Sequence, residues 1–270
     1  MKSRSHYSHH GHGKKPISFF ERLNLFIILP IILVLISGII IGFHFHWGAH
    51  HGVIPWGNLL GGMGLTLLRL FISYILALVI GIPLALWTQT NRRAEEILLP
   101  VFDVLESVPI LVFFPVVVIF FVQLGFFNTA AIFIIFVSML WTVVFSVIGG
   151  LKSIPEDIFS VAHVFHLTGW KKLREITLPA VVPSIVTGSI LAWAGGWNII
   201  IVAEVLHTYI PSNIPVHDLF GIGSILVASS ANNEKAIFLA SVGIIVIVIM
   251  ILNFFVWQKL LRLSERFKFE

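Results

Sequence analysis

Residues 236–257 read Ala-Ile-Phe-Leu-Ala-Ser-Val-Gly-Ile-Ile-Val-Ile-Val-Ile-Met-Ile-Leu-Asn-Phe-Phe-Val-Trp and contain no charged side chain; Lys235 and Lys259 stand on either side. About 20 apolar residues in a helix cross the hydrocarbon core of a bilayer, so this stretch is long enough to span it. Because the core offers no water to backbone amides and carbonyls, the stretch must satisfy them internally, as a helix does. Residues 236–257 therefore predict a transmembrane helix.

The composition of the whole chain extends this prediction. Of its 270 residues, 57% are hydrophobic and 11% are charged, whereas soluble domains carry about 25% charged residues. The mean hydropathy is +0.99. The chain has no cysteine, which excludes disulfides, thiol nucleophiles and cysteine metal sites. Its formal charge of +4 comes from basic residues beside apolar stretches, so we interpret it as a topology signal and expect no nucleic-acid partner.

Charged residues divide the chain into six apolar stretches, which predict an all-α polytopic membrane bundle of six transmembrane helices. These stretches are Leu25–Phe43, Leu65–Trp87, Val108–Val122, Thr129–Gly149, Val181–Leu206 and Ala236–Trp257. Pro100, Pro109 and Pro115 interrupt the third stretch, which predicts a short or kinked helix preceded by an interfacial segment. The glycine, histidine and tryptophan content of residues 42–64 favours a loop or an interfacial helix.

The basic residues predict how the bundle is oriented. Lysine and arginine are enriched in the cytoplasmic loops of membrane proteins. With six crossings, 15 of the 17 basic residues fall on one side, Lys235 falls on the other, and Arg69 lies at a span boundary. We therefore expect both termini to be cytoplasmic.

Motifs for common chemistry are absent from the sequence. It contains no G-x-x-x-x-G-K-[ST] phosphate loop, no H-E-x-x-H and no G-x-S-x-G. We therefore expect a chain that is not an enzyme and that holds no cofactor of its own.

Residues 1–24 lack the apolar core of a cleaved signal peptide, so we expect no such peptide there.

The most informative loop joins the fourth and fifth predicted spans. Pro155 suits the first turn of a helix, and the acidic residues after it suit the positive end of the helix dipole. A turn around 166–169 and a second short helix, from Trp170 to a point before Pro179, follow. Two such helices suit docking into a groove of another protein, and a loop lying on the membrane surface is the alternative.

This loop resembles the "EAA" loop of ABC importer permeases, which runs E-A-A-x-x-x-G and ends in I-x-L-P. Ile176-Thr-Leu-Pro179 matches the end of the motif, and Ala162 matches its second alanine. Ser160, Val161 and His166 stand where the family has Glu, Ala and Gly. Further similarities lie at Gly64–Arg69, Gly81–Ala85, Val108–Pro115, Thr187-Gly188 and Val202–Glu204. Together they look most like the nitrate, sulfonate and bicarbonate branch of these importers.

The resemblance implies a type I permease core preceded by one extra helix, in the cell membrane. It implies import of a small anion such as nitrate, sulfonate or bicarbonate, by a homodimer or heterodimer of permeases. A cytoplasmic ABC ATPase would hold ATP and Mg²⁺, and an extracytoplasmic solute-binding protein would deliver the solute. The docking residues would be Pro155, Ile158, Val161, Ala162, Phe165, His166, Gly169, Trp170, Leu173, Ile176, Leu178 and Pro179.

The expected organisation has four parts. They are a cytoplasmic histidine-rich tail (1–24), an extra helix with its extracytoplasmic loop (25–61), the permease domain (62–257) with its cytoplasmic loop 153–179, and a cytoplasmic tail (258–270).

Polar residues within the spans are candidates for the translocation pathway, because such groups usually face a bundle interior or water. These candidates are Gln123, Trp141, Trp197, Asn198 and Glu204. Close helix packing is the alternative role for Gly195 and Gly196 beside them. Arg69 and Glu204 form either an ion pair or two headgroup contacts, and an interfacial position is favoured for Arg69. Asp103 and Glu106 form either a polar gate or a hydrated face.

Histidines supply a second functional hypothesis. They cluster at His6, His9, His10 and His12, and again at His44, His46, His50 and His51. Imidazole is a common metal ligand, so the second cluster is a weak candidate metal site. An ATP-independent metal or proton-coupled carrier, using these clusters with Glu106 or Glu204, is therefore the alternative function. A membrane assembly factor that transports nothing is a third.

Overall fold

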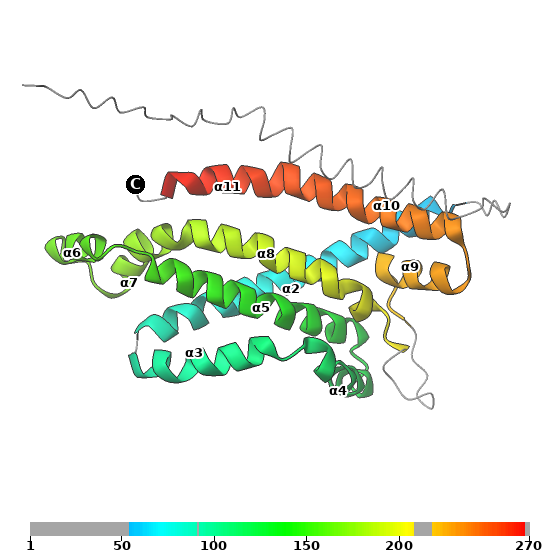
Figure 1. Cartoon of the computed structure of the whole chain (residues 1–270), viewed down its shortest axis with the longest axis horizontal. Helices are drawn as coiled ribbons and strands as arrows, with labels where there is room; N and C mark the ends of the chain where they lie inside the picture. Colours follow the sequence, from blue (N-terminus) through cyan, green and yellow to red (C-terminus); the bar gives the residue numbers. More distant parts are fainter. Residues whose placement is uncertain (1–53, 91, 208–217, 268–270) are drawn as a thin grey trace, which may run out of the picture. The chain divides into compact units, whose positions relative to one another are not determined.

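The computed structural model describes residues 54–90, 92–207 and 218–267, and these parts of the chain are helical with short connections (Figure 1). The α-helices are α2 (Trp56–Thr90), α3 (Arg92–Ser107), α4 (Ile110–Gln123), α5 (Phe127–Lys152), α6 (Glu156–Val164), α7 (Gly169–Lys172), α8 (Leu178–Glu204), α9 (Ile222–Ala231), α10 (Lys235–Leu252) and α11 (Gln258–Ser264). Two π-helical turns, η1 (Leu173–Thr177) and η3 (Asn253–Trp257), and a 3-10 turn, η4 (Glu265–Phe267), join or extend them.

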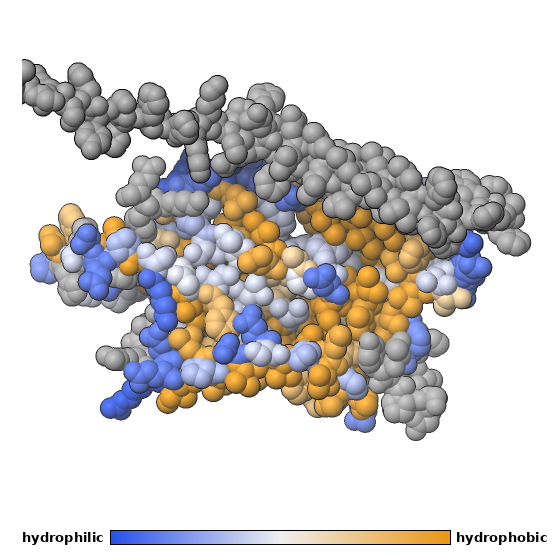
Figure 2. Space-filling view, in the orientation of Figure 1, coloured by the Kyte–Doolittle hydropathy of each residue, from blue (hydrophilic) through white to orange (hydrophobic). Residues whose placement is uncertain are grey.

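Within the described residues, four helices are long and apolar enough to cross a membrane, and a fifth crossing results if α3 and α4 count as one span. These correspond to the second through sixth predicted spans. Hydrophobic residues cover much of the face seen in Figure 2, as expected of a surface in contact with lipid. The first predicted span, Leu25–Phe43, and both tails lie outside the described residues, so six crossings and cytoplasmic termini remain predictions.

Helices α2, α5 and α8 form the centre of the bundle, and α5 and α8 pack antiparallel through small residues. Gly150 of α5 lies against Ser184 of α8, and Gly188 of α8 lies against Ser146 of α5. A β-carbon at either glycine would overlap its serine partner, so glycine sets the close approach of the two helices. Gly196 likewise lies against Met139, which supports the packing role for this glycine.

Helix α2 begins earlier than predicted. The loop or interfacial helix expected for residues 42–64 is wrong from Trp56 onward, where the chain is already part of the spanning helix. The reason is tertiary: Leu59 and Met63 are buried in a cluster with Ile222 of α9 and Ile244 of α10. A composition rich in glycine therefore forms a helix where neighbouring helices cover its apolar side chains.

Helices α3 and α4, here called the bent pair, meet at an angle of 84°. This confirms the predicted kink, and α3 is the helix that precedes it, while its predicted interfacial position stays a prediction. Of the three prolines, only Pro109 lies at the break, because Pro100 and Pro115 lie inside helices. A proline N-terminal to α4 needs no hydrogen bond from its nitrogen, so the chain turns there at little cost.

Helices α6 and α7, with the turn between them, form the loop that we call the elbow (residues 156–172). The structure confirms the two short helices predicted for this loop, but the second helix does not end before Pro179. Helix α7 continues through η1 into α8 as one rod, Gly169–Glu204. The π turn bonds the Leu178 amide to the Leu173 carbonyl, and Pro179 follows in the first turn of α8. The shift from the i−4 ladder explains how the helix passes a proline.

Helix α9 was not predicted. It is a short apolar helix between α8 and α10, and it packs on α2, α8 and α10. Beyond it, α10, η3, α11 and η4 run as one continuous helix from Lys235 to Phe267.

Candidate functional site

The elbow carries one buried face and one exposed apolar tip. Ala162 is buried, and Ile158 packs against the core of the bundle. Val164, Phe165 and Trp170 are 75%, 70% and 70% exposed. Because the loop is anchored on one face, these three side chains form an apolar surface that is free to contact another protein.

The other predicted docking residues flank this tip. Pro155, His166 and Gly169 are exposed, and Leu173, Ile176, Leu178 and Pro179 are half-buried where η1 enters α8. Nothing is described for the side chain of Val161. Apart from Val161, the predicted docking residues therefore lie along one stretch from Pro155 through the elbow to the start of α8, while their role in docking remains a prediction.

The turn of the elbow is built from two left-handed residues. His166 has φ +52° and Gly169 has φ +54°. The Leu167 amide donates to the Ala162 carbonyl at 2.9 Å and closes the end of α6. Glycine adopts positive φ without cost, which explains why the resembling motif has glycine at the position of His166. The structure keeps this turn with a histidine in its place.

At the same end of the bundle, an ion pair joins the bent pair to α5. Lys152 Nζ lies 2.7 Å from Glu95 Oε1, with half of the lysine side chain exposed. Lys152 ends α5 shortly before the elbow, so this contact links the start of α3 to the elbow.

The opposite end of the bundle holds a buried polar network, here called the ionic hub. It contains the side chains of Thr66, Arg69, Asn128 and Glu204 with backbone groups of Phe220, Ile222 and Gly223. Arg69 Nη1 donates to Glu204 Oε1 at 2.7 Å, and Thr66 Oγ1 donates to the same oxygen at 2.7 Å. The Gly223 amide donates to Glu204 Oε2 at 2.8 Å. Both carboxylate oxygens are therefore satisfied.

The hub also satisfies the guanidinium and the start of α9. Arg69 Nε and Nη2 donate to Asn128 Oδ1 at 3.1 and 2.9 Å, and Nη2 donates to the Phe220 carbonyl at 3.1 Å. The Ile222 amide donates to Thr66 Oγ1 at 3.0 Å. The Glu204 carboxylate thus lies at the positive end of the α9 dipole.

The structure corrects the favoured interpretation of Arg69. It lies inside the bundle, 5% exposed, in an ion pair with a fully buried Glu204. The interfacial position was wrong because α2 extends upstream to Trp56, which places Arg69 well within the helix. Sequence reasoning also missed Thr66, Asn128 and the glycines of the hub. Thr66 stands three residues before Arg69, on the same helix face, which was a usable signal.

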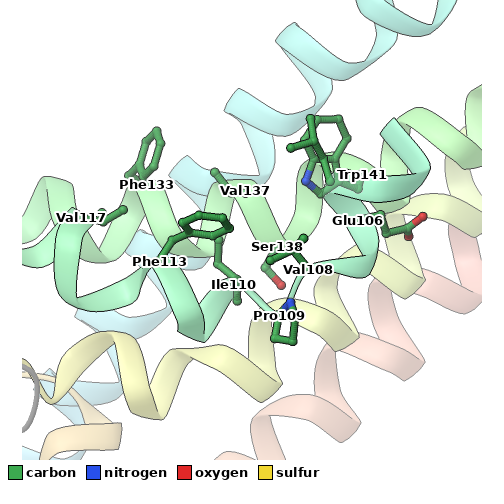
Figure 3. A pocket seen from close by; sticks show the side chains of 11 residues that line it. Glu106, Val108, Pro109, Ile110, Phe113, Val117, Phe133, Val137, Ser138 and Trp141 are labelled. Atoms are coloured by element: carbon green, nitrogen blue, oxygen red, sulfur yellow. The ribbon is translucent and has the colours of Figure 1, made fainter. Parts of the chain in front are cut away.

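A cavity of about 400 Å³ lies between the bent pair and α5 (Figure 3). Its walls are mostly apolar, with Glu106, Ser138 and Trp141 as the polar side chains. The break at Val108 and Pro109 forms one side, which fits the rule that non-helical backbone at membrane depth lines a cavity or is covered by protein.

The predicted pathway residues do not share one cavity. Trp141 lines this one, whereas Gln123 and Asn198 are exposed elsewhere, Trp197 packs beside Trp193, and Glu204 belongs to the hub. Glu106 lines the cavity and Asp103 is exposed, so a gate and a hydrated face both remain open for that pair.

The four histidines of the candidate metal site, His44, His46, His50 and His51, lie outside the described residues. Among the residues that the structure describes, no group of three or more histidine, aspartate or glutamate side chains is arranged to hold a metal ion. The metal-carrier hypothesis is therefore untested.

Comparison with known proteins agrees with the fold. Residues 77–264 match the family model of the binding-protein-dependent transport system inner membrane component. Among solved structures, the MetNI methionine ABC transporter in an inward-facing conformation aligns with a TM-score of 0.67 at 17% identity, covering 79% of this chain and 99% of that one. At this identity the match shows the fold: a type I ABC permease.

Curated relatives include the nitrate import permease protein NrtB of Leptolyngbya laminosa, 29% identical over 67% of this chain and 61% of its own. The bicarbonate transport system permease protein CmpB of Synechococcus elongatus is 32% identical over 52% of this chain and 50% of its own. The chain thus matches between half and two thirds of their length. A putative ABC transporter permease protein of Methanocaldococcus jannaschii is 23% identical over 91% of this chain and 90% of its own.

The elbow and the helices on either side of it lie within the matched residues, as do Asn128 and Glu204 of the hub, whereas Thr66 and Arg69 lie before the match begins. The family match covers well over half of the chain, the solved fold agrees with it, and the relatives are transport permeases. This multi-pass membrane chain therefore belongs to the family of binding-protein-dependent transport system inner membrane components.

Proposed function

We propose that the chain is the permease subunit of an ATP-driven importer and moves a small anion inward by alternating access. ATP and Mg²⁺ are held by a partner ATPase, and this chain makes and breaks no covalent bond. A second permease copy or a paralogue completes the pathway, and a solute-binding protein delivers the solute on the outer side of the cell membrane.

The elbow is the observation that carries this proposal. Its exposed tip of Val164, Phe165 and Trp170 offers apolar side chains to a groove on a partner, which is how short amphipathic helices bind proteins. Ala162 and Ile158 fix the loop to the bundle from behind. A partner bound to the tip is therefore attached to a segment that is packed against the bundle.

The connection from the elbow to the bundle suits force transmission. Helix α7, η1 and α8 form one continuous rod, so a movement of the tip reaches the core without a flexible joint. In the core, Gly188 and Gly196 hold α8 against α5. The elbow is thus mechanically coupled to the centre of the bundle.

The relatives support the solute class. Their names assign nitrate and bicarbonate to permeases that match this chain, and a third is a putative aliphatic sulfonates transport permease of Bacillus subtilis. All three are small anions or carry an anionic group. We infer the same class for this chain.

The first test is co-purification of the ATPase. The chain is tagged and purified from native membranes, and partners are identified by mass spectrometry. Phe165→Asp with Trp170→Asp removes the apolar tip, and Phe267→Asp, an exposed apolar position on η4, is the matched control. We expect an ABC ATPase with the wild type and the control and none with the double variant. An ATPase retained by the double variant would contradict docking at the tip.

The second test is uptake. Cells that carry the whole system take up labelled nitrate, bicarbonate or an alkyl sulfonate, and deletion of this chain abolishes that uptake. Import that continues without the ATPase would contradict the proposal and favour the carrier hypothesis.

A further inference from the structure

The ionic hub makes one part of the permease resistant to internal rearrangement. Its contacts join α2 through Thr66 and Arg69, α5 through Asn128, α8 through Glu204, and α9 through its first amides. Glu204 is fully buried, so separating it from Arg69 leaves an uncompensated charge inside the protein. These helices, here called the frame (α2, α5, α8 and α9), therefore move together.

Steric contacts hold the frame as firmly as the polar ones. Gly150 and Gly188 fit directly against serines across the α5–α8 interface, and Gly81 of α2 lies against Val143 of α5. Sliding one helix along another would push these positions onto larger side chains. Packed interfaces of this kind shift between discrete arrangements rather than deforming gradually.

The bent pair is held differently. Of its described side chains, Phe102, Phe114 and Val118 are buried and the rest are exposed or half-buried. Pro100 and Pro115 each remove one backbone hydrogen bond from α3 and α4, and Pro109 sits at the 84° bend. Few buried side chains and interrupted helical hydrogen bonds mark the part of a structure that opens most easily.

The cavity gives the bent pair room to move. It lies directly between the break at Val108–Pro109 and α5, so the pair can approach α5 without displacing a packed core (Figure 3). The ion pair between Lys152 of α5 and Glu95 of α3 is partly exposed, so breaking and re-forming it costs little free energy.

We propose that the bent pair is the moving gate of the permease, that it swings about a hinge at Val108–Pro109 into and out of the adjacent cavity, and that the frame stays rigid throughout. The proposal rests on the transport function proposed above, because a gate has meaning only in a permease. It assigns the mobile element and the hinge, which neither the family nor the relatives identify.

The test measures distances between spin labels in the full chain in lipid nanodiscs, and it needs no transport. The natural chain has no cysteine, so each label sits at an introduced one. The gate pair is Val116→Cys with Gly149→Cys, which joins α4 to α5; Val116 is 69% exposed. The frame pair is Gly64→Cys with Gly149→Cys, which joins α2 to α5. A β-carbon at Gly64 or at Gly149 meets no atom within 4 Å, so these substitutions preserve the fold.

We expect one narrow distance distribution for the frame pair and a broad or two-peaked one for the gate pair. Glu204→Gln, added to the frame pair, should broaden its distribution because the buried Arg69 then loses its ion-pair partner. Equal widths for the two pairs, or a frame pair that stays narrow with Glu204→Gln, would overturn the proposal. Failure of cells with the whole, unmutated system to take up any of the labelled anions would count against the transport function and leave these distances unaffected.

Discussion

Arg69 and Glu204 show how the chain places two charges inside a membrane protein. Isolated ionised groups in hydrocarbon are costly, so they pair with each other or with backbone groups. Here each nitrogen of the guanidinium and each oxygen of the carboxylate has at least one hydrogen-bond partner. Since the donors of Arg69 are directed to protein acceptors, the residue holds helices together and is a poor candidate for binding a transported anion.

The hub predicts that removing either of its two charges strongly destabilises the protein. Glu204→Gln or Arg69→Met leaves the partner charge buried and unpaired, which costs about 3–5 kcal/mol. Thermal unfolding of the purified chain in detergent measures this as a lower midpoint. Glu175→Gln, at an exposed position inside the continuous helix Gly169–Glu204, is the control that should leave the midpoint unchanged. Equal midpoints for Glu204→Gln and the control would contradict the structural role of the hub.

Two glycines predict opposite outcomes for the same substitution. A β-carbon at Gly221 would collide with the Glu204 carboxylate, so Gly221→Ala should destabilise the protein and lower its expression. Gly64 lies on the exposed side of α2 with no atom near its β-carbon, so Gly64→Ala should stabilise the helix by about 0.5–1 kcal/mol. Unfolding midpoints of the two variants test the pair together, and a Gly221→Ala variant as stable as the wild type would be inconsistent with the hub geometry.

His166 predicts a stabilising substitution. Its left-handed backbone costs about 1–2 kcal/mol for a residue with a β-carbon, and glycine removes most of that cost. Part of the gain is lost to the greater freedom of glycine in the unfolded chain, so His166→Gly should add about 0.5–1 kcal/mol. His166→Ala keeps the β-carbon and should bring no gain. A glycine variant no more stable than the alanine variant would show that the turn is relaxed.

At the scale of helices, the molecule divides into tightly and loosely packed elements. Helices α5 and α8 meet through glycine and serine along their length, whereas α3 and α4 touch the bundle through a few buried side chains. The contrast also appears in the ion pairs. The exposed Lys152–Glu95 pair is worth about 0–1 kcal/mol, far less than the cost of breaking a buried pair.

Fixing α3 to α5 should therefore stop transport. Glu95→Cys with Lys152→Cys, joined by a short thiol-reactive cross-linker, replaces a weak contact with a covalent one. We expect uptake of the labelled anion to fall on cross-linking and to recover when a reducible linker is cleaved. Each single cysteine variant, treated with the same reagent, is the control. Full uptake by the cross-linked double variant would show that α3 need not move relative to α5.

Several elements were predictable because their signals are local. The apolar stretches at 65–87, 129–149 and 236–257 exceed the length that a bilayer requires, and each falls within a helix of the structure. Proline chemistry predicted a kink in the third span but did not decide which of its three prolines lies at the break. The same chemistry misplaced the end of the second elbow helix at Pro179, because η1 changes the hydrogen-bond register just before it.

At the scale of the whole molecule, the elbow and the hub lie at opposite ends of α8. The continuous helix Gly169–Glu204 begins beside the exposed tip of the elbow and ends at Glu204, so one element connects that tip with the buried charges at the other end. In the proposed importer, a movement that a partner imposes on the elbow would pass through this rod to the frame.

The sequence by itself determined the membrane class, the approximate positions of the apolar helices that the structure describes, the two short helices of the elbow and the family. These follow from hydropathy, turn chemistry and short motifs. Each of these signals comes from residues that are close together in the sequence, so it can be recognised without the tertiary structure. The candidate docking residues were found for the same reason, since they are neighbours in one loop.

Only the tertiary structure decided where α2 begins, that α9 exists, and that Arg69 is buried rather than interfacial. Each depends on contacts between distant parts of the chain: Arg69 and Glu204 are 135 residues apart, and Leu59 and Met63 form helix where α9 and α10 cover them. A buried ion pair is stable only when its partners, backbone donors and surrounding packing are all in place. No local pattern contains that information, because the desolvation that decides it is a property of the folded bundle.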